Sequence, residues 1–455
     1  MTARWPPILC ATTPGVAVSR RLSISVLASA IRHPLNAIPA EAFHEKLVYS
    51  RLAGMTRIHI TDPELVHEAL VVNAGALVKG PGAGPGPRLP AADGAHRRQQ
   101  RQAMAAILHT DSLQAYLPRM IAAAEATRDR WLSWPKERVV DIGSEMRHTA
   151  FEIIAATMLS DRGDVGSTER FERCVGDCSR PTRWMLASSL LAVPEWLPCP
   201  GRRKARSAMA LLKAEFARTI AARRHGPTGH GDLLERLMSA VNSESRRALT
   251  DQELIDHLFI LISAGHGATA LALAWVFCLL CRHPDVEARI LEEIETLCGD
   301  GPVRAEHIQS LSWTRQVIQE AMRLYPPVPI VARTVGHSFR LDDFALSAGT
   351  VIHVPIYAIH RHSRLWERPG DFDPTRFSTE ACKDRHRCAY MPFGAGPRVC
   401  IGAAFAMMET TAVLAVLLKS VRIRMSKAGL EPTPMARGTL GPAEPLWMSV
   451  SSREP

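Results

Sequence analysis

A single cysteine, Cys400, stands between a glycine-rich loop and a long apolar run, and this arrangement constrains the fold more than any other part of the chain. The loop, residues 393–402, reads FGAGPRVCIG. The run 403–418 (AAFAMMETTAVLAVLL) predicts a buried helix that begins just after the cysteine. Because unpaired amides and the helix dipole favour negative charge at that end, we expect the Cys400 thiol to be shifted toward thiolate, the form that ligates metals.

The loop resembles the haem-binding segment of the cytochrome P-450 family, F-x-x-G-x-R-x-C-x-G, with every fixed position present. Its glycines allow backbone bends and the close approach of a flat ligand, which a Cβ would block. The resemblance implies haem b (iron protoporphyrin IX) as the cofactor and Cys400 as the ligand of its iron. Phe393, Gly394 and Gly402 are then expected to contact the haem. The alternative is a lone buried cysteine before a core helix, because free cysteine often packs as a small hydrophobe.

Two segments upstream of the loop also resemble this family. Glu320 and Arg323 are three residues apart, so they share a face of the helix expected over 314–324 and can pair. This helix resembles the family's E-x-x-R helix, and residues 372–377 (FDPTRF) resemble its meander segment. The resemblance implies that Arg376 completes a buried, structural Glu–Arg–Arg cluster behind the haem. An exposed surface pair, which contributes little to stability, is the alternative.

The propionates of a haem are carboxylates, which arginine side chains bind with paired hydrogen bonds. Arg398 precedes Cys400 by two residues and is the first candidate. Arg333 follows the proline turn at the spacing that the family uses for a second. We expect both arginines to contact the cofactor.

A third propionate contact is expected from a helix that begins near residue 94. The family often has H-x-x-x-R there; His96 fills the first position, Gln100 fills the second, and Arg101 is adjacent. We expect His96 and Arg101 to contact the haem. Arg97, Arg98 and Arg101 fit equally well as a solvated face that docks an acidic partner protein, because charge steers association.

The central helix departs from the family pattern. Residues 263–269 (SAGHGAT) resemble the family's A-G-x-[D/E]-T, and Ala264 and Gly265 match it. Gly267 stands at the acid position and Ala268 at the alcohol position. The resemblance implies that these residues line the oxygen-binding groove. General acid catalysis needs a positioned donor, and neither side chain supplies one.

Three proton sources remain for such a groove. Thr269 lies one residue after the alcohol position, so its side chain is turned by about 100° around the helix from that position. His266 fits a core or surface position better than the groove. We therefore expect the bound substrate to supply a hydroxyl or carboxylate, or to order the water itself.

The rest of the chain predicts few elements as clearly. The alternating run 56–60 predicts a strand, and Thr61 or Asp62 caps a short helix with Pro63 in its first turn. The run 250–282 predicts the longest helix, and residues 337–355 predict short strands of a small sheet. Residues 80–90 form a Gly/Pro-rich loop, which the resemblance places over the substrate pocket.

Composition narrows the class of protein. The chain has 455 residues, 46% hydrophobic and 22% charged, with a formal net charge of +10. No Lys/Arg run has the five to eight residues typical of a nucleic-acid patch. Ten irregularly spaced cysteines indicate reduced thiols in a cytoplasm, and the pair Cys278–Cys281 lies in an apolar helical run as part of the core. No apolar run reaches the length of a membrane anchor.

We interpret residues 1–40, which contain no acidic residue, as a poorly structured leader or a targeting segment, and residues 41–455 as one domain. The resemblance implies a mainly α cytochrome P-450 fold with a small β subdomain, in a monomer. It implies a monooxygenase that inserts one atom of O2 into an apolar, lipid-like or terpenoid molecule. Electrons would come from a separate ferredoxin and ferredoxin reductase. A peroxide-driven or isomerising haem-thiolate enzyme, or a haem-based sensor without turnover, are the alternatives.

Overall fold

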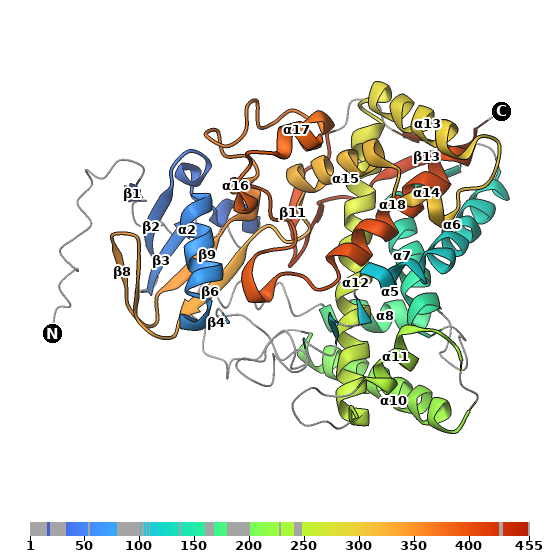
Figure 1. Ribbon diagram of the computed structural model, residues 1–455, viewed down its shortest axis with the longest axis horizontal. Helices are drawn as coiled ribbons and strands as arrows, with labels where there is room; N and C mark the ends of the chain where they lie inside the picture. The colour runs from blue at the N-terminus through green and yellow to red at the C-terminus, as the bar shows by residue number, and fades with distance from the viewer. Residues whose placement is uncertain are drawn as a thin grey trace.

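The computed structural model of the chain describes thirteen stretches: 16–18, 33–52, 55–79, 101, 104–105, 107–108, 110–135, 138–159, 168–179, 201–226, 229–240, 248–426 and 431–453. The predictions for the 80–90 loop, for His96 and for Arg97 and Arg98 lie outside these residues. Most of the predicted leader lies outside them as well. The described residues form a helical part and a smaller β part, side by side (Figure 1).

Helices make up most of the described chain, as expected for the mainly α fold. The helices are α2 (Pro63–His67), α5 (Thr110–Gln114), α6 (Leu117–Leu132), α7 (Ile142–Met158), α8 (Thr168–Ser179), α10 (Arg202–His225), α11 (Leu233–Ser239), α12 (Asp251–Leu280), α13 (Pro284–Cys298), α14 (Ala305–Ile308), α15 (Ser312–Leu324), α16 (Ile356–Ile359), α17 (Thr379–Cys382) and α18 (Ala403–Ser420). Short 3-10 turns are η1 (Pro34–Ala37), η2 (Ala40–Phe43), η4 (Ala74–Ala76), η5 (Pro374–Phe377), η6 (Arg387–Ala389) and η7 (Gly396–Arg398), and η3 (Glu68–Val72) is a π-helix.

The long helix α12 runs through the middle of the helical part (Figure 1). It begins at the predicted capping box, in which the Thr250 hydroxyl and the Glu253 carboxylate each bond the other's backbone amide. Its neighbours α7, α10, α15 and α18 pack around it, and its second half is buried almost throughout. Cys278 is part of this core, and burial raises the pKa of its thiol to about 12. The core interpretation of the cysteine pair therefore fits the structure.

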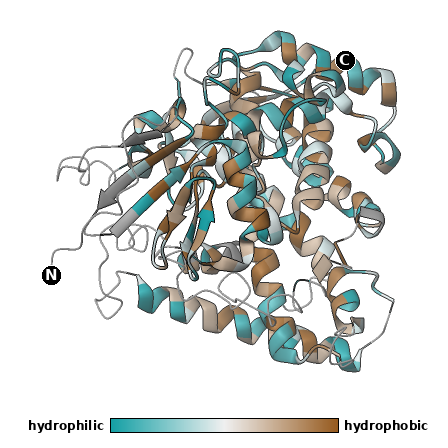
Figure 2. Ribbon diagram, turned by 60° about the vertical axis from the view of Figure 1, so that its left-hand side comes forward, coloured by the Kyte–Doolittle hydropathy of each residue, from teal (hydrophilic) through white to brown (hydrophobic). Residues whose placement is uncertain are grey.

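The outer helices alternate between hydrophilic and hydrophobic residues along their length (Figure 2). On α10 the buried residues are Ala205, Ala208, Leu212, Phe216 and Ile220. Their spacing of three and four places them on one stripe of the helix, which faces the core. The remaining faces of α10 carry Lys and Arg and face solvent.

The β part is built mainly from strands near the N-terminus and from strands within residues 331–354. The strands are β1 (Val16–Val18), β2 (Leu47–Leu52), β3 (Met55–Ile60), β4 (Leu77–Lys79), β5 (Arg138–Asp141), β6 (Val331–Val335), β7 (Phe339–Leu341), β8 (Phe344–Leu346), β9 (Val351–Val354), β10 (Val421–Met425), β11 (Pro434–Ala436), β12 (Leu440–Pro442) and β13 (Trp447–Ser452). Strands β10, β13 and β5 form a separate sheet. The largest sheet has the order β1-β2-β3-β9-β6-β4. Its β4–β6 edge matters for the site, because it pairs Lys79 with Arg333.

Residues before position 40 contact the β part of the molecule. Residues 34–37 form η1, and Ile38 is buried against Val48 and Ala358. Apolar contacts therefore already hold Ile38, which lies just before the predicted boundary at residue 40.

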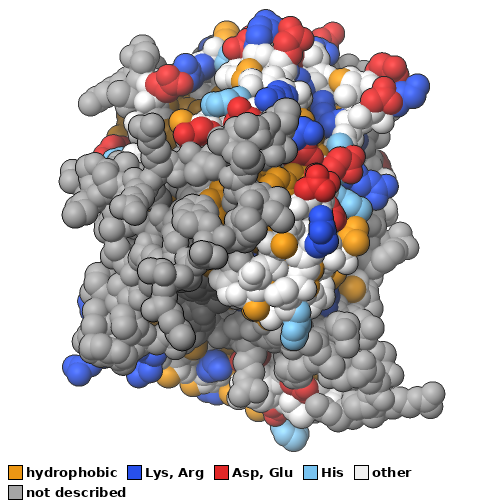
Figure 3. Space-filling view, turned by 90° about the vertical axis from the view of Figure 1, so that its left-hand side faces the viewer, with side chains coloured by type: hydrophobic (Ala, Val, Ile, Leu, Met, Phe, Trp, Pro, Cys, Tyr) orange, Lys and Arg blue, Asp and Glu red, His pale blue; other side chains and the backbone are white. Residues whose placement is uncertain are grey.

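Two helices, α12 and α18, have the length and hydropathy to cross a membrane, although the sequence suggested that no run would. Just over half of each apolar window, 56%, is buried by other parts of the protein. Core helices commonly show such hydropathy, so it is weak evidence for a membrane span. On the described part of the face in Figure 3, Lys and Arg are interspersed with Asp and Glu rather than gathered in one basic patch.

Candidate active site

The loop around Cys400 is held by its own backbone. The amide of Cys400 donates to the carbonyl of Phe393 at 2.9 Å, and the amide of Val399 donates to that of Gly396 at 3.0 Å. The α18 helix then starts at Ala403, with Gly402 as its N-cap residue. The sulfur of Cys400 thus lies just before the helix N-terminus, as the sequence predicted, and the residue is exposed.

The protonation of Cys400 differs from the prediction. Its side chain is open on one side, but the surrounding protein desolvates the sulfur, and this raises the pKa of the thiol. The Gly402 amide and the charge of Arg101 lower that pKa, but they do not outweigh the desolvation. The helix end thus acts on the Cys400 thiol in the predicted direction, but desolvation outweighs it. A bound metal cation would supply the missing stabilisation, because a coordinating thiol is deprotonated.

The Cys400 loop also contacts the β part of the molecule. Gly396 has a φ of +70° and lies against the backbone carbonyl of Leu70, in the π-helix η3. A Cβ at this position would overlap that carbonyl. The loop can therefore take this path only with glycine at position 396.

Three cations gather beside the loop. Arg333 and Lys79 are register partners on β6 and β4, and the charges of Arg398 and Arg333 lower the pKa of Lys79, after the larger effect of its burial, to about 8. Sequence reasoning identified both arginines but missed Lys79, because the β4–β6 pairing that places it joins distant parts of the chain. Like charges this close are unfavourable alone, so the cluster suits a ligand with more than one negative charge.

The α12 segment of the site carries small side chains. Ala264 is exposed although α12 is a core helix, and Gly267 and Ala268 are only partly buried. At Gly265 a Cβ would overlap the Cδ1 atom of Ile154 on α7, whereas at Gly267 nothing lies within 4 Å of an added Cβ. Gly265 thus lies close against the Ile154 side chain of α7, while Gly267 leaves open space.

Two of the polar residues of this segment, His266 and Thr269, pack against other elements. His266 places Nδ1 2.7 Å from the Ile262 carbonyl and packs edge-on against Phe151 of α7, and burial lowers the pKa of its imidazole. Thr269 is buried at 3% exposure and faces Glu409 of α18. Glu409 lies in the run 403–418 that predicts the last helix, and no role was predicted for it.

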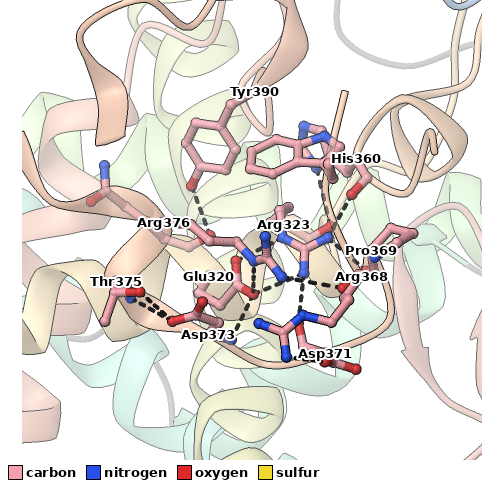
Figure 4. Close-up of polar contacts among 12 residues, drawn as sticks. Glu320, Arg323, His360, Arg368, Pro369, Asp371, Asp373, Thr375, Arg376 and Tyr390 are labelled. Atoms are coloured by element: carbon pink, nitrogen blue, oxygen red, sulfur yellow. Dashed lines mark hydrogen bonds and ion pairs between the residues drawn. The ribbon is translucent and has the colours of Figure 1, made fainter. Parts of the chain in front are cut away.

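Glu320 and Arg323 form a fully buried pair (Figure 4). Arg323 donates to both oxygens of Glu320, at 2.7 and 2.8 Å. Its remaining hydrogen bonds go to the backbone carbonyls of His360, Pro369 and Asp371, at 2.7, 2.8 and 2.9 Å. Burial raises the pKa of Glu320, and the bonds from Arg323 lower it in part. A charge pair that is buried and fully bonded is costly to break.

Arg376 completes the predicted group of three. Its Nε lies 3.5 Å from Glu320 Oε1, and its Nη2 donates to the Arg368 carbonyl at 3.2 Å. The amide of Asp373 donates to the same Glu320 oxygen at 2.9 Å. The meander segment is thereby joined to α15 (Figure 4).

His360 connects this cluster to the Cys400 loop, which the sequence did not suggest. Its Nδ1 lies 3.2 Å from the Arg323 carbonyl, and its Nε2 accepts from the Met391 amide at 2.9 Å. This pattern requires the neutral ring protonated on Nδ1. Burial lowers the pKa of His360 to about 3, so the ring stays neutral. Met391 is two residues before Phe393, where the loop begins.

Comparison with known proteins gives this geometry its context. Residues 33–447 match the family model for Cytochrome P450. The cyclooctat-9-en-7-ol 5-monooxygenase of Streptomyces melanosporofaciens is 32% identical over 398 residues, 86% of each chain. The pentalenene oxygenase of Streptomyces avermitilis is 30% identical over 434 residues, 93% of this chain and 94% of that one. The chain belongs to the cytochrome P450 family.

Solved P450 structures share the fold. The heme domain of cytochrome P450DA superposes with a TM-score of 0.79 at 22% identity, covering 94% of this chain and 92% of that one. Retinoic acid-bound cyanobacterial CYP120A1 gives 0.77 at 24% identity, covering 90% and 92%. The predicted P450 fold is confirmed, and the protein is a P450 monooxygenase with haem b as its cofactor.

The residues present fit a haem. Cys400 offers a thiol, and the described residues contain no group of three or more His, Cys, Asp or Glu that could hold a metal without a porphyrin. The first residues of α18, among them Phe405 and Met408, are apolar yet only partly buried, as expected for a surface that receives a flat apolar ligand. Lys79, Arg333 and Arg398 place positive charge beside the loop, which matches the charge of two propionates.

Proposed function

We propose that this P450 monooxygenase oxidises an apolar, terpenoid-like small molecule with electrons from a separate ferredoxin and its reductase. The observation that carries the substrate class is the small apolar surface of α12, exposed at Ala264 and partly exposed at Gly267 and Ala268. Such a surface gives a bulky, ring-containing molecule room beside the cofactor and excludes water from it. Two relatives are named for the oxidation of cyclooctat-9-en-7-ol and pentalenene, which supports the same class.

Each site residue has a task in this proposal. Cys400 ligates the haem iron, and Phe393, Gly394 and Gly402 shape the loop around it. Arg333 and Arg398, with Lys79, bind the propionates, and Arg101 and His96 keep the propionate role predicted for them. When bound, the haem supplies the chemistry that cleaves O2 and inserts one oxygen atom into a C–H bond.

The protein itself ligates the haem, orients the substrate and excludes water from the site. Gly265 fixes α12 against α7, so that the small residues around it keep their place. The Glu320–Arg323–Arg376 group and His360 hold the loop from behind, and their role is structural.

The positive charge of the protein indicates an acidic electron donor. The chain has a net charge of +10, and Arg101 lies close enough to Cys400 for its charge to lower the pKa of the thiol. A cation near the ligand loop favours an acidic electron donor, and such association weakens with salt. We expect Arg101→Glu to slow reduction by a ferredoxin several-fold. Arg340→Glu, on the exposed hairpin β7–β8, should leave the rate unchanged.

A spectroscopic screen tests the substrate class. We expect pentalenene, cyclooctat-9-en-7-ol and related terpenoids to shift the absorption of the oxidised protein, and a surrogate ferredoxin with its reductase to give hydroxylated product. Fatty acids that bind while every terpenoid fails would contradict the proposal. We expect these reactions to take place in the cytoplasm, by a monomer.

A second candidate rests on Gly267 and Ala268, which leave the groove without the acid and the alcohol. A peroxide-driven or isomerising haem-thiolate enzyme does not need them. Product formed with peroxide but not with ferredoxin and NADPH would select it. A ligand-induced spectral shift without product under any electron supply would instead select a sensor.

A further inference from the structure

A pocket outside the haem site opens between the end of α15, α16 and the segment that leads into β11 (Figure 1). Its volume is about 440 Å³, which lies in the range of small-molecule sites. The lining includes Tyr325, Tyr357, Arg361, Glu431, Pro432 and Pro434. None of its lining residues is among those assigned to the haem, the oxygen groove or the buried charge cluster, so the pocket has no task in the proposed monooxygenase.

Arg361 is the cation of this pocket. Its guanidinium carbon lies 3.9 Å from the centre of the Tyr357 ring and 5.6 Å from that of Tyr325. Among the described residues, no group accepts a hydrogen bond from the guanidinium, and its Nη1 atom is buried without a partner. The aromatic faces stabilise the charge but leave its donors unused. Because an unsatisfied charged donor is costly to bury, the pocket suits a ligand that accepts from Arg361.

No acid of the pocket balances this charge. Glu431, the one carboxylate of the lining, is 69% exposed and pairs with Arg282 at 3.1 Å instead. Glu320 acts on Arg361 from further away, but both of its oxygens are bonded to Arg323. Burial lowers the pKa of Arg361, as expected for a cation without a counter-ion of its own. The pocket therefore has an uncompensated positive charge inside and a paired acid at its rim.

The walls of the pocket carry flat rings. Tyr325 and Tyr357 contribute aromatic side chains, and Pro432 and Pro434 contribute rigid rings from the segment that enters β11. The Tyr325 ring is stacked on Trp275 of α12, with ring centres 3.8 Å apart and planes at 5° to each other. This stacking holds Tyr325 in place as a wall of the pocket. Rigid aromatic walls favour a flat ligand, which they contact over a large area.

We propose that this pocket binds a small aromatic carboxylate, with the carboxylate on Arg361 and the aromatic ring beside Tyr325 and Tyr357. The planar guanidinium matches a carboxylate in shape as well as in charge, because it can donate two parallel hydrogen bonds. The site shares no residue with the haem site. Its ligand is therefore independent of the substrate class proposed above.

Calorimetric titration of the haem-loaded protein with benzoate tests the site. We expect one benzoate to bind per protein without a change in the haem absorption spectrum, and to raise the temperature of unfolding. Benzyl alcohol, which has the ring without the charge, and acetate, which has the charge without the ring, should both bind more weakly than benzoate.

Three variants assign the binding to this pocket. Arg361→Met should weaken benzoate binding by about tenfold or more, because it removes hydrogen bonds to a charged group. Arg364→Met is the matched control on the same segment, where Arg364 is 51% exposed and pairs with Glu45 at 3.6 Å; it should leave the affinity unchanged. Glu431→Gln should strengthen binding by about twofold or more, because it removes a negative charge from the rim.

Three results would overturn the inference: no binding of benzoate at millimolar concentration, benzoate binding that Arg361→Met leaves unchanged, or binding of acetate or inorganic phosphate as tight as that of benzoate. The carbon monoxide spectrum and thermal unfolding show whether each variant is folded and loaded with haem. If Arg361→Met does not fold, Arg361→Lys, which keeps the charge and loses the planar group, decides with Glu431→Gln. An unchanged benzoate affinity in both would then contradict the site.

Discussion

The backbone carbonyl of Leu70, in a π-helical turn, lies directly against Gly396 of the cysteine loop. This contact joins the β part of the molecule to the loop that presents Cys400. Both the space beside Leu70 and the φ of +70° favour glycine at this position.

Gly394 offers a matched comparison for this contact. Its φ is +77°, but nothing lies within 4 Å of an added Cβ. We expect Gly394→Ala to cost about 1–2 kcal/mol from the left-handed backbone alone. Gly396→Ala should cost clearly more and should lower the haem content of the purified protein. Equal haem content and equal thermal stability of the two variants would contradict the close contact with Leu70.

The contact between α7 and α12 predicts that a substitution on one helix restores the stability lost by a substitution on the other. Gly265→Ala places a methyl group on Ile154 Cδ1, and such overpacking costs about 1–3 kcal/mol. Ile154→Val removes that atom, so the double variant should recover most of the loss in the free energy of unfolding. Gly267→Ala should stabilise the helix by about 1 kcal/mol, because its Cβ enters open space. Additive effects of Gly265→Ala and Ile154→Val would argue against the contact.

The buried charge cluster around Glu320 should lose stability when lysine replaces one of its arginines. Arg323→Lys cannot reproduce the bonds to both Glu320 oxygens and to three carbonyls, and a broken buried pair costs about 3–5 kcal/mol. We expect little folded, haem-loaded protein from this variant. Arg376→Lys should lose less, because Arg376 is 11% exposed and its contact with Glu320 is longer, at 3.5 Å. Chemical denaturation of the two variants measures the difference, and the reverse order of stability would contradict this account.

His360 predicts a loss of stability in acid. Its pKa is about 3 in the folded protein against an ordinary value of 6.5, so between these values the unfolded chain binds more protons. Stability therefore falls as the pH drops through this window, by about 1.4 kcal/mol per pH unit for such a group. His360→Gln should flatten the decline of the unfolding free energy with pH, whereas the exposed His337→Gln should not. An unchanged slope in His360→Gln would contradict the assignment.

Sequence reasoning reached furthest where the interaction is local. The Asp62 cap, which accepts from two amides of the next turn, and the Thr250–Glu253 capping box both join residues within one helical turn. The Glu320–Arg323 pair does so as well. Spacing along the chain determines such contacts, so capping and periodicity rules are sufficient to predict them.

The remaining features depend on tertiary packing. Lys79 reaches Arg333 only through the pairing of β4 with β6, and His360 reaches the cysteine loop only once α15 and the meander have packed. The protonation of the Cys400 thiol was predicted from the nearby helix end. Desolvation by the folded protein instead determines the sign of its pKa shift.

The central claim is that the Cys400 thiolate ligates the haem iron, and the carbon monoxide spectrum of the reduced protein tests it most directly. The account predicts the red-shifted absorption band of a thiolate-ligated haem in the wild-type protein and its loss in Cys400→Ser. A wild-type protein that binds haem without this band, or a Cys400→Ser protein that keeps it, would contradict the claim.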